Sequence, residues 1–129
     1  MQLRKLHFAL GLTGVAAFIV TGAYMRAGFP DLYAMNEVLR YLYRSNHVYL
    51  LLASLVNVAL GVHLTAPAPG WRAGVSLLGS VLALAAPVVL CLAFFLEAPV
   101  PTPERVLTLI GVVAVTAGIA LHALGGLRR

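Results

Sequence analysis

The chain has 129 residues, of which 61% are hydrophobic and only 10% are charged. A soluble domain carries about a quarter charged residues, so this composition excludes a soluble domain, and with it a folded basic face that could bind nucleic acid. Four long segments contain no Asp, Glu, Lys or Arg, namely residues 6–25, 45–71, 73–96 and 106–127. A transmembrane helix needs about 20 apolar residues, so we predict one all-α domain over residues 1–129, a four-helix transmembrane bundle.

The charged residues divide between the two sides of such a bundle. The N-terminus, the second loop and the C-terminus carry basic residues and no acid. All four acids lie in the first and third loops, where they are balanced by Arg26, Arg40, Arg44 and Arg105. Basic residues mark the cytoplasmic side of a bacterial inner (plasma) membrane. We therefore expect a multi-pass protein in that membrane with both termini in the cytoplasm, and the net charge of +5 reflects this topology.

The first span is predicted at about residues 7–25, with small residues along one face. His7, Gly11, Gly14 and Phe18 lie on this face at helical spacing. Small residues allow helices to approach closely in lipid. The simplest interpretation is a packing face with a histidine at its membrane edge.

An amphipathic helix is expected over about residues 31–44, between spans one and two. Pro30 and Asp31 suggest a helix start, and apolar residues then recur at helical spacing while Glu37, Arg40 and Arg44 point elsewhere. Such a helix would lie on the outer membrane surface. It either connects the two spans or forms a docking surface for a partner protein or a quinone.

The second span, about residues 46–65, carries polar side chains that a lipid-facing helix would not need. His47, Ser54, Asn57 and Gly61 share one side. Asn57 comes ten residues after His47, so it lies roughly 15 Å deeper, near the middle of a hydrocarbon layer about 30 Å thick. We therefore expect Ser54 and Asn57 to bond another helix.

The third span, about residues 73–96, contains Pro87, which leaves the carbonyl of Ala83 without its usual helical donor. This carbonyl is one candidate partner for the Asn57 amide. Hydroxyl groups are the other candidates, on Thr13, Ser80, Thr108 and Thr116.

The fourth span is predicted at about residues 105–124. It carries small residues and His122 at offsets that alternate between four and three, which is typical of a packed helix face.

Three histidines are expected at one depth near the cytoplasmic edge: His7 begins span one, His63 ends span two, and His122 nearly ends span four. Two imidazoles from different helices could hold a b-type haem. Three could hold zinc or copper, although no carboxylate on this side could support the ligands. The simplest alternative is that these histidines lie among lipid headgroups without a ligand.

On the outer side, His47 and Arg44 form a candidate quinone contact, because an imidazole and a guanidinium could both hydrogen-bond a quinone carbonyl. The simpler interpretation is that His47 and Arg44 lie at a helix start at the membrane surface.

Residues 39–49, LRYLYRSNHVY, followed by the helix with Asn57 and Gly61, resemble small four-span proteins of bacterial inner membranes. This resemblance implies the four-span fold and no particular activity.

Apart from histidines and Arg105, which stands at the first residue of the fourth span, no acidic or basic side chain lies inside a predicted span, which argues against a proton-coupled pump. We therefore expect a non-catalytic integral inner-membrane protein, most simply a small helical subunit or accessory protein. Its partners would be the lipid bilayer and other membrane subunits or a second copy. The alternative is an electron-transfer module that holds b-type haem through two histidines and interacts with quinone.

Overall fold

The structure, a computed structural model, describes residues 2–33, 37–64, 69–100 and 104–126, and this part of the chain is all-helical. It contains the helices α1 (Gln2–Tyr33), α2 (Glu37–His63), α3 (Trp71–Leu96) and α4 (Val106–Gly126). All four are long and apolar enough to cross a membrane. The predicted all-α chain with four possible spans is therefore confirmed.

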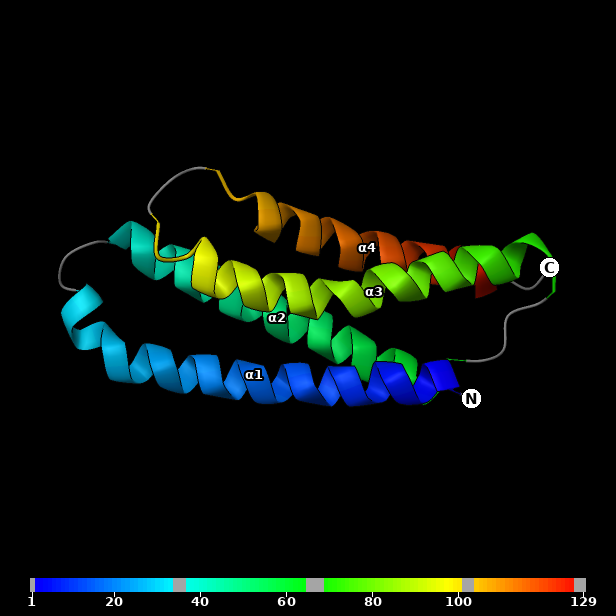
Figure 1. Cartoon of the computed structure of the whole chain (residues 1–129), viewed down its shortest axis with the longest axis horizontal. Helices are drawn as coiled ribbons and strands as arrows, with labels where there is room; N and C mark the ends of the chain where they lie inside the picture. The colour runs from blue at the N-terminus through cyan, green and yellow to red at the C-terminus, as the bar shows by residue number, and fades with distance from the viewer. Residues whose placement is uncertain (1, 34–36, 65–68, 101–103, 127–129) are drawn as a thin grey trace.

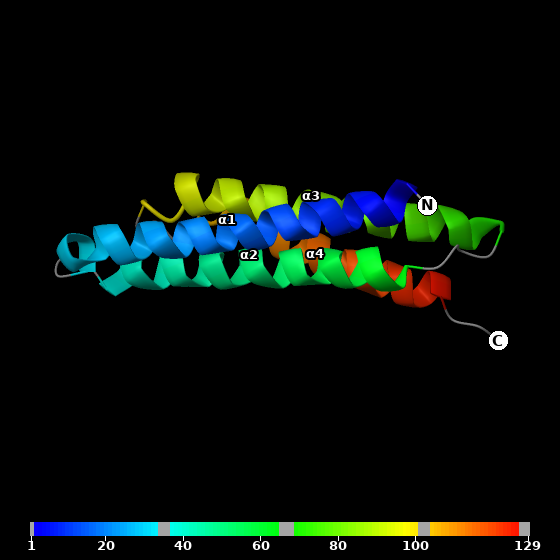
Figure 2. The same ribbon diagram turned by 90° about the horizontal axis from the view of Figure 1, so that it is seen from below.

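The four helices run antiparallel to their chain neighbours, so α1 begins and α4 ends at the same end of the bundle (Figures 1 and 2). We call this end the terminus end, and the opposite end, where α3 is followed by α4, the loop end. The most extensive contacts join α1 to α2 and α3 to α4, and the two pairs meet mainly through α2 and α3. Helices α2 and α3 are therefore central.

Small side chains fill the centre of the bundle, and large apolar ones cover its outside. Leu50, Ala53, Ala86 and Leu90 are fully buried, and they form one cluster with residues of α4. Large side chains such as Leu109 are more than half exposed. This distribution suits a lipid environment, where helices associate by close packing rather than by hiding apolar surface from water.

Glycines set the closest approaches between helices. A Cβ at Gly61 would lie 2.6 Å from the backbone nitrogen of Phe8, so α1 and α2 touch there through their backbones. A Cβ at Gly118 would lie 2.9 Å from the carbonyl oxygen of Gly79, which joins α4 to α3 in the same way. The predicted faces of small residues are thus packed within the chain.

The segment expected to form a separate surface helix, residues 31–44, is divided between two longer helices. Helix α1 continues to Tyr33, and residues 37–44 form the first turns of α2, while residues 34–36 lie outside the described part of the chain. The apolar residues of this segment explain the difference, because Leu42 and Tyr43 pack with Met25 and Phe94 in a buried cluster. From residue 37 onward, the helical spacing of this segment therefore belongs to α2.

Candidate functional site: a buried histidine cluster

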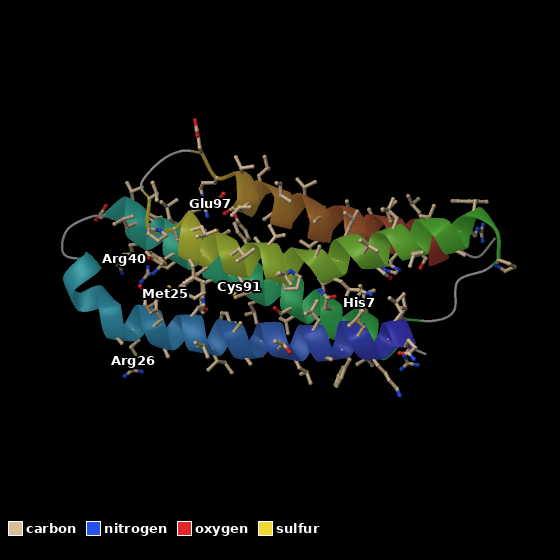
Figure 3. The ribbon with its side chains drawn as sticks, viewed as in Figure 1. His7, Met25, Arg26, Arg40, Cys91 and Glu97 are labelled. Atoms are coloured by element: carbon tan, nitrogen blue, oxygen red, sulfur yellow. The ribbon has the colours of Figure 1, made fainter. Side chains whose placement is uncertain are left out.

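Polar side chains from all four helices meet inside the bundle. This histidine cluster consists of His7 from α1, Asn57 from α2, Ser76, Ser80 and the carbonyl of Ala83 from α3, and His122 from α4. Figure 3 shows the His7 side chain pointing from α1 into the bundle. His7, Asn57 and Ser80 are fully buried, so this polar cluster lies within an apolar surrounding, where its hydrogen bonds are strong.

The Asn57 amide joins three helices. Its Nδ2 donates to the carbonyl of Ala83 on α3 at 2.6 Å and to that of Ala53 on its own helix at 2.8 Å. Its Oδ1 lies 2.7 Å from Nδ1 of His7 on α1. Of the candidate partners, the carbonyl of Ala83, which Pro87 leaves without a helical donor, is therefore the one that the Asn57 amide bonds. Ser54 was expected to bond another helix, but its hydroxyl donates to the carbonyl of Leu50 on its own helix.

The bond to Asn57 sets the tautomer of His7. An amide oxygen only accepts hydrogen bonds, so Nδ1 of His7 donates and carries the proton of the neutral ring. The other ring nitrogen, Nε2, is then an acceptor. It is buried and has no hydrogen-bond partner among the described residues.

His122 lies beside His7 and uses both of its ring nitrogens. Nδ1 is 3.2 Å from the Ser76 hydroxyl, and Nε2 is 3.1 Å from the Ser80 hydroxyl. One nitrogen of a neutral imidazole donates and the other accepts, so the two serines take opposite roles. The rings of His7 and His122 meet edge to face, with centroids 6.2 Å apart.

His63 does not join the other two histidines. It is exposed at the last residue of α2, six residues and so about 9 Å along the helix from Asn57. His7 lies deeper than expected, because α1 begins at Gln2 and its antiparallel course brings residue 7 beside Asn57. Within the described ranges, no group of three or more His, Cys, Asp or Glu residues could hold a metal ion. The expected three-histidine site is thus reduced to a pair.

His47, the candidate quinone contact, packs against α1. Its Nδ1 is 2.9 Å from the hydroxyl of Thr21, and its ring stacks on Phe18 with centroids 3.9 Å apart. The Thr21 hydroxyl also lies 3.0 Å from the carbonyl of Phe18 and donates to it, so His47 is the donor to Thr21. Arg44 lies one turn earlier on α2 and is exposed.

A second polar group, which the sequence did not indicate, lies at the loop end. This loop-end cluster consists of Ser45 and Asn46 from α2, Glu97 after α3, and Arg105 and Thr108 at the start of α4. The buried Asn46 side chain donates to the carbonyl of Ala93 at 3.1 Å, and its Oδ1 accepts from Arg105. The cluster therefore ties α2, α3 and α4 together.

The carboxylate of Glu97 caps the N-terminus of α4. Its oxygens accept from the backbone nitrogens of Leu107 and Thr108, the latter at 2.9 Å, and from the Thr108 hydroxyl at 2.7 Å. Burial acts to raise the pKa of Glu97, but these hydrogen bonds and the nearby Arg105 outweigh it, so the pKa is lowered. A sequence pattern that could have located this cap is an acid directly after α3 and a base directly before α4.

Two cavities lie away from the histidine cluster. One of about 230 Å³ is an apolar groove between α1 and α3, with Gly14, Leu50 and Pro87 among its lining residues. The other, of about 420 Å³, lies at the terminus end and is lined by basic as well as apolar residues. Neither is lined by a histidine. Of the predicted haem ligands, His7 and His122 lie in contacts between helices, and His63 is exposed.

The chain matches no protein-family model, no curated protein and no solved structure. Its function must therefore be argued from the geometry of its own residues. Three of the four histidines, at positions 7, 47 and 122, make contacts between helices. These contacts link α1 to α2 and α3 to α4.

Proposed function

We propose that the chain is a non-catalytic integral membrane protein, a small helical subunit or accessory protein of a larger membrane assembly. The observation that carries this proposal is the placement of its polar side chains. His7, His47, Asn57 and His122 are hydrogen-bonded between helices. Side chains bonded in this way stabilise a bundle, whereas a catalytic site would present them to a substrate cavity.

The proposed location is a bacterial inner membrane, with the terminus end in the cytoplasm. The support is the charge distribution: among the described residues, the terminus end carries Arg4, Lys5 and Arg72 with no acid, whereas the loop end carries bases that acids balance, namely Arg26, Arg40, Arg44 and Arg105 with Glu37, Glu97 and Glu104. Cytoplasmic loops carry an excess of Lys and Arg.

The first turns of α2 are proposed to lie in the outer headgroup region. A helix of 27 residues is about 40 Å long, which exceeds a hydrocarbon core of about 30 Å. Glu37, Arg40 and Arg44 are exposed along these turns, and Figure 3 labels Arg40 at the loop end. Residues 37–44 would thus act as a surface segment continuous with the span.

Site-specific photo-crosslinking in intact membranes tests the assembly. A photoreactive residue is placed at Ile19, Val81 or Leu109, whose side chains are more than half exposed on three different helices. The matched control is Leu50, which is fully buried. We expect at least one exposed position to give a discrete crosslink to a second chain, whether another subunit or another copy, and Leu50 to give none. A chain that crosslinks from no exposed position and runs as a lone monomer in mild detergent would contradict the proposal.

A second candidate function is electron transfer through b-type haem, with a quinone near His47. The observation in its favour is the pair of imidazoles from α1 and α4, whose centroids are 6.2 Å apart, together with the Nε2 of His7, which no described residue hydrogen-bonds. To admit a haem between them, α1 and α4 would have to separate and the bond from His122 to Ser80 would have to break. An absorption spectrum tests this candidate. A Soret band that shifts on reduction and is lost in His122→Ala would favour haem, whereas a colourless protein from cells with adequate haem would remove it.

A further inference from the structure

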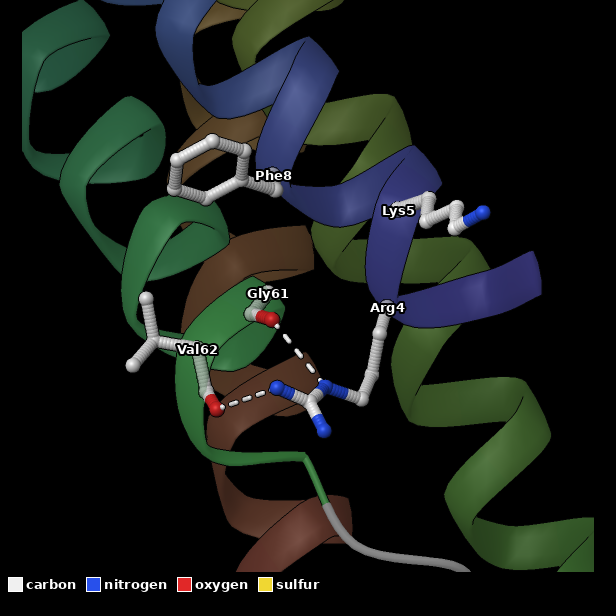
Figure 4. A pocket seen from close by; sticks show the side chains of 5 residues that line it. All are labelled: Arg4, Lys5, Phe8, Gly61 and Val62. Atoms are coloured by element: carbon white, nitrogen blue, oxygen red, sulfur yellow. Dashed lines mark hydrogen bonds between the residues drawn. The ribbon is translucent and has the colours of Figure 1, made fainter. Parts of the chain in front are cut away.

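A basic cavity lies at the terminus end, where the first turns of α1 meet the last turn of α2. It measures about 420 Å³ and is lined by Arg4, Lys5, Phe8, Gly61 and Val62 (Figure 4). The lining residues carry two positive charges and no negative one. Among the described side chains the acids (Glu37, Glu97 and Glu104) lie at the loop end. The cavity is therefore an electropositive site at a membrane edge.

The guanidinium of Arg4 is held in place by the end of α2. Its Nε donates to the carbonyl of Gly61 at 3.3 Å, and one Nη donates to the carbonyl of Val62 at 3.0 Å (Figure 4). These carbonyls need outside donors because the last four carbonyls of a helix have none within it. A guanidinium has five N–H groups, so the two bonds leave three for an anion. The charge is thus fixed in position before any ligand arrives.

The remaining wall of the cavity is apolar and exposed. The side chains of Phe8 and Val62 are 41% and 48% exposed, and they lie next to Arg4 and Lys5 in the same cavity. A free phosphate ion would gain nothing from such a wall. A molecule with an anionic head and a hydrocarbon chain would contact both parts at once.

We propose that this cavity binds the phosphate group of an anionic phospholipid, with an acyl chain lying against Phe8 and Val62. Arg4 donates hydrogen bonds to the phosphate oxygens, and the exposed ammonium of Lys5 adds a second positive charge. Basic pockets between transmembrane helices at the cytoplasmic side are suited to lipid headgroups. The site needs only the membrane-spanning fold, so it does not depend on the proposed subunit function.

The test is a lipid titration of the purified full-length protein in neutral detergent, followed by native mass spectrometry. Phosphatidylglycerol, phosphatidylcholine and inorganic phosphate are titrated in parallel. We expect one phosphatidylglycerol to bind roughly thirtyfold more tightly than phosphatidylcholine, since the cavity is lined by two basic residues and each contributes about fivefold near a membrane surface. Inorganic phosphate at millimolar concentration should not displace it.

Two matched variants locate the site. Lys5→Gln removes an exposed charge from the cavity and should weaken phosphatidylglycerol binding about fivefold. Arg72→Gln removes one charge from the start of α3 at the same end and should leave binding unchanged. Equal binding of the two lipids, equal loss in both variants, or displacement by inorganic phosphate would each overturn the proposal. The first result would show no preference for an anionic headgroup, the second would show only a general surface charge, and the third would show a site for free anions.

Discussion

At the residue scale, one asparagine amide supplies the hydrogen bond that a proline removes from a neighbouring helix. Pro87 removes the donor for the carbonyl of Ala83, and Asn57 on the neighbouring helix replaces it at 2.6 Å. A bare carbonyl in hydrocarbon costs several kilocalories per mole, so a freed group must find such a partner. The same amide fixes His7 through its oxygen.

The substitution Asn57→Leu should therefore destabilise the bundle by about 1–2 kcal/mol, because it leaves the carbonyl of Ala83 and the Nδ1 of His7 without partners. The free energy of unfolding would be measured by circular dichroism during titration with a denaturing detergent. Leu55→Ala is the control, since Leu55 is half exposed on the same helix and should change stability much less. Equal effects of the two substitutions would show that the amide contributes nothing specific.

Glu97 gives the molecule a pH dependence at its loop end. Its pKa in the folded protein is lowered from the ordinary value of 4.5, so the carboxylate contributes stability above the unfolded-state pKa. That contribution is lost as the pH falls through the folded pKa. Glu97→Gln should cost about 1 kcal/mol at neutral pH, as the loss of a helix cap does. In strong acid, where Glu97 of the wild type is protonated, the two proteins should converge.

Thermal unfolding between about pH 3 and pH 7 checks this prediction. Glu104→Gln serves as the control, because Glu104 is also an acid next to the start of α4 but is exposed. Its substitution should shift the unfolding temperature little at any pH. If Glu97→Gln unfolds at the wild-type temperature at neutral pH, Glu97 does not cap α4.

At the scale of the helices, backbone contact through glycine sets the geometry of each pair. Gly118 and Gly79 bring α4 and α3 together so closely that a Cβ at either position would meet backbone atoms within 3.1 Å. Gly118→Ala should therefore destabilise the protein by about 1–3 kcal/mol through overpacking. Detergent-induced unfolding is again the measurement.

Gly74 provides the matched control on α3. A Cβ at Gly74 meets nothing within 4 Å, so Gly74→Ala should be neutral or stabilise the protein by up to about 1 kcal/mol through helix propensity. Destabilisation by Gly74→Ala as large as that by Gly118→Ala would mean that helix packing does not distinguish the two glycines.

The helices and their packed faces were predictable because their signals are local. Small residues at helical spacing identified the contact faces, and Pro87 identified a carbonyl that needed a donor. The choice among the candidate partners of Asn57 was not predictable. Thr13 and Thr116 donate to carbonyls of their own helices, four residues earlier in each case, and thus do not need the amide.

The loop-end cluster and the division of residues 31–44 depend on long-range packing. Asn46 and Arg105 come from helices that are not consecutive, and a sequence alone gives no register between them. Pro30 and Asp31 suggested a helix start, but α1 continues through them to Tyr33. Three pairs could be drawn from His7, His63 and His122. The structure pairs His7 with His122, and this pairing depends on the position along the bundle at which α1 begins.

At the scale of the whole molecule, the charge distribution predicts that the terminus end faces the cytoplasm. Cysteine labelling in intact cells with a membrane-impermeant maleimide checks this orientation, in a Cys91→Ala background. Val100→Cys, exposed at the loop end, should be labelled from outside. Trp71→Cys, exposed at the terminus end, should be labelled only after the membrane is opened. The reverse labelling pattern would show that the loop end faces the cytoplasm, and the packing of the helices would be unaffected by that result.

The central claim is that four spanning helices enclose the Asn57 amide so that neither water nor acyl chains reach it. Nuclear magnetic resonance of the Asn57 side-chain NH₂ group in lipid nanodiscs measures this directly, through hydrogen exchange and through broadening by spin-labelled lipid. We predict slow exchange and little broadening, because Asn57 is fully buried and its Nδ2 is bonded to Ala53 and Ala83. Fast exchange, or strong broadening by the lipid label, would contradict the bundle described here.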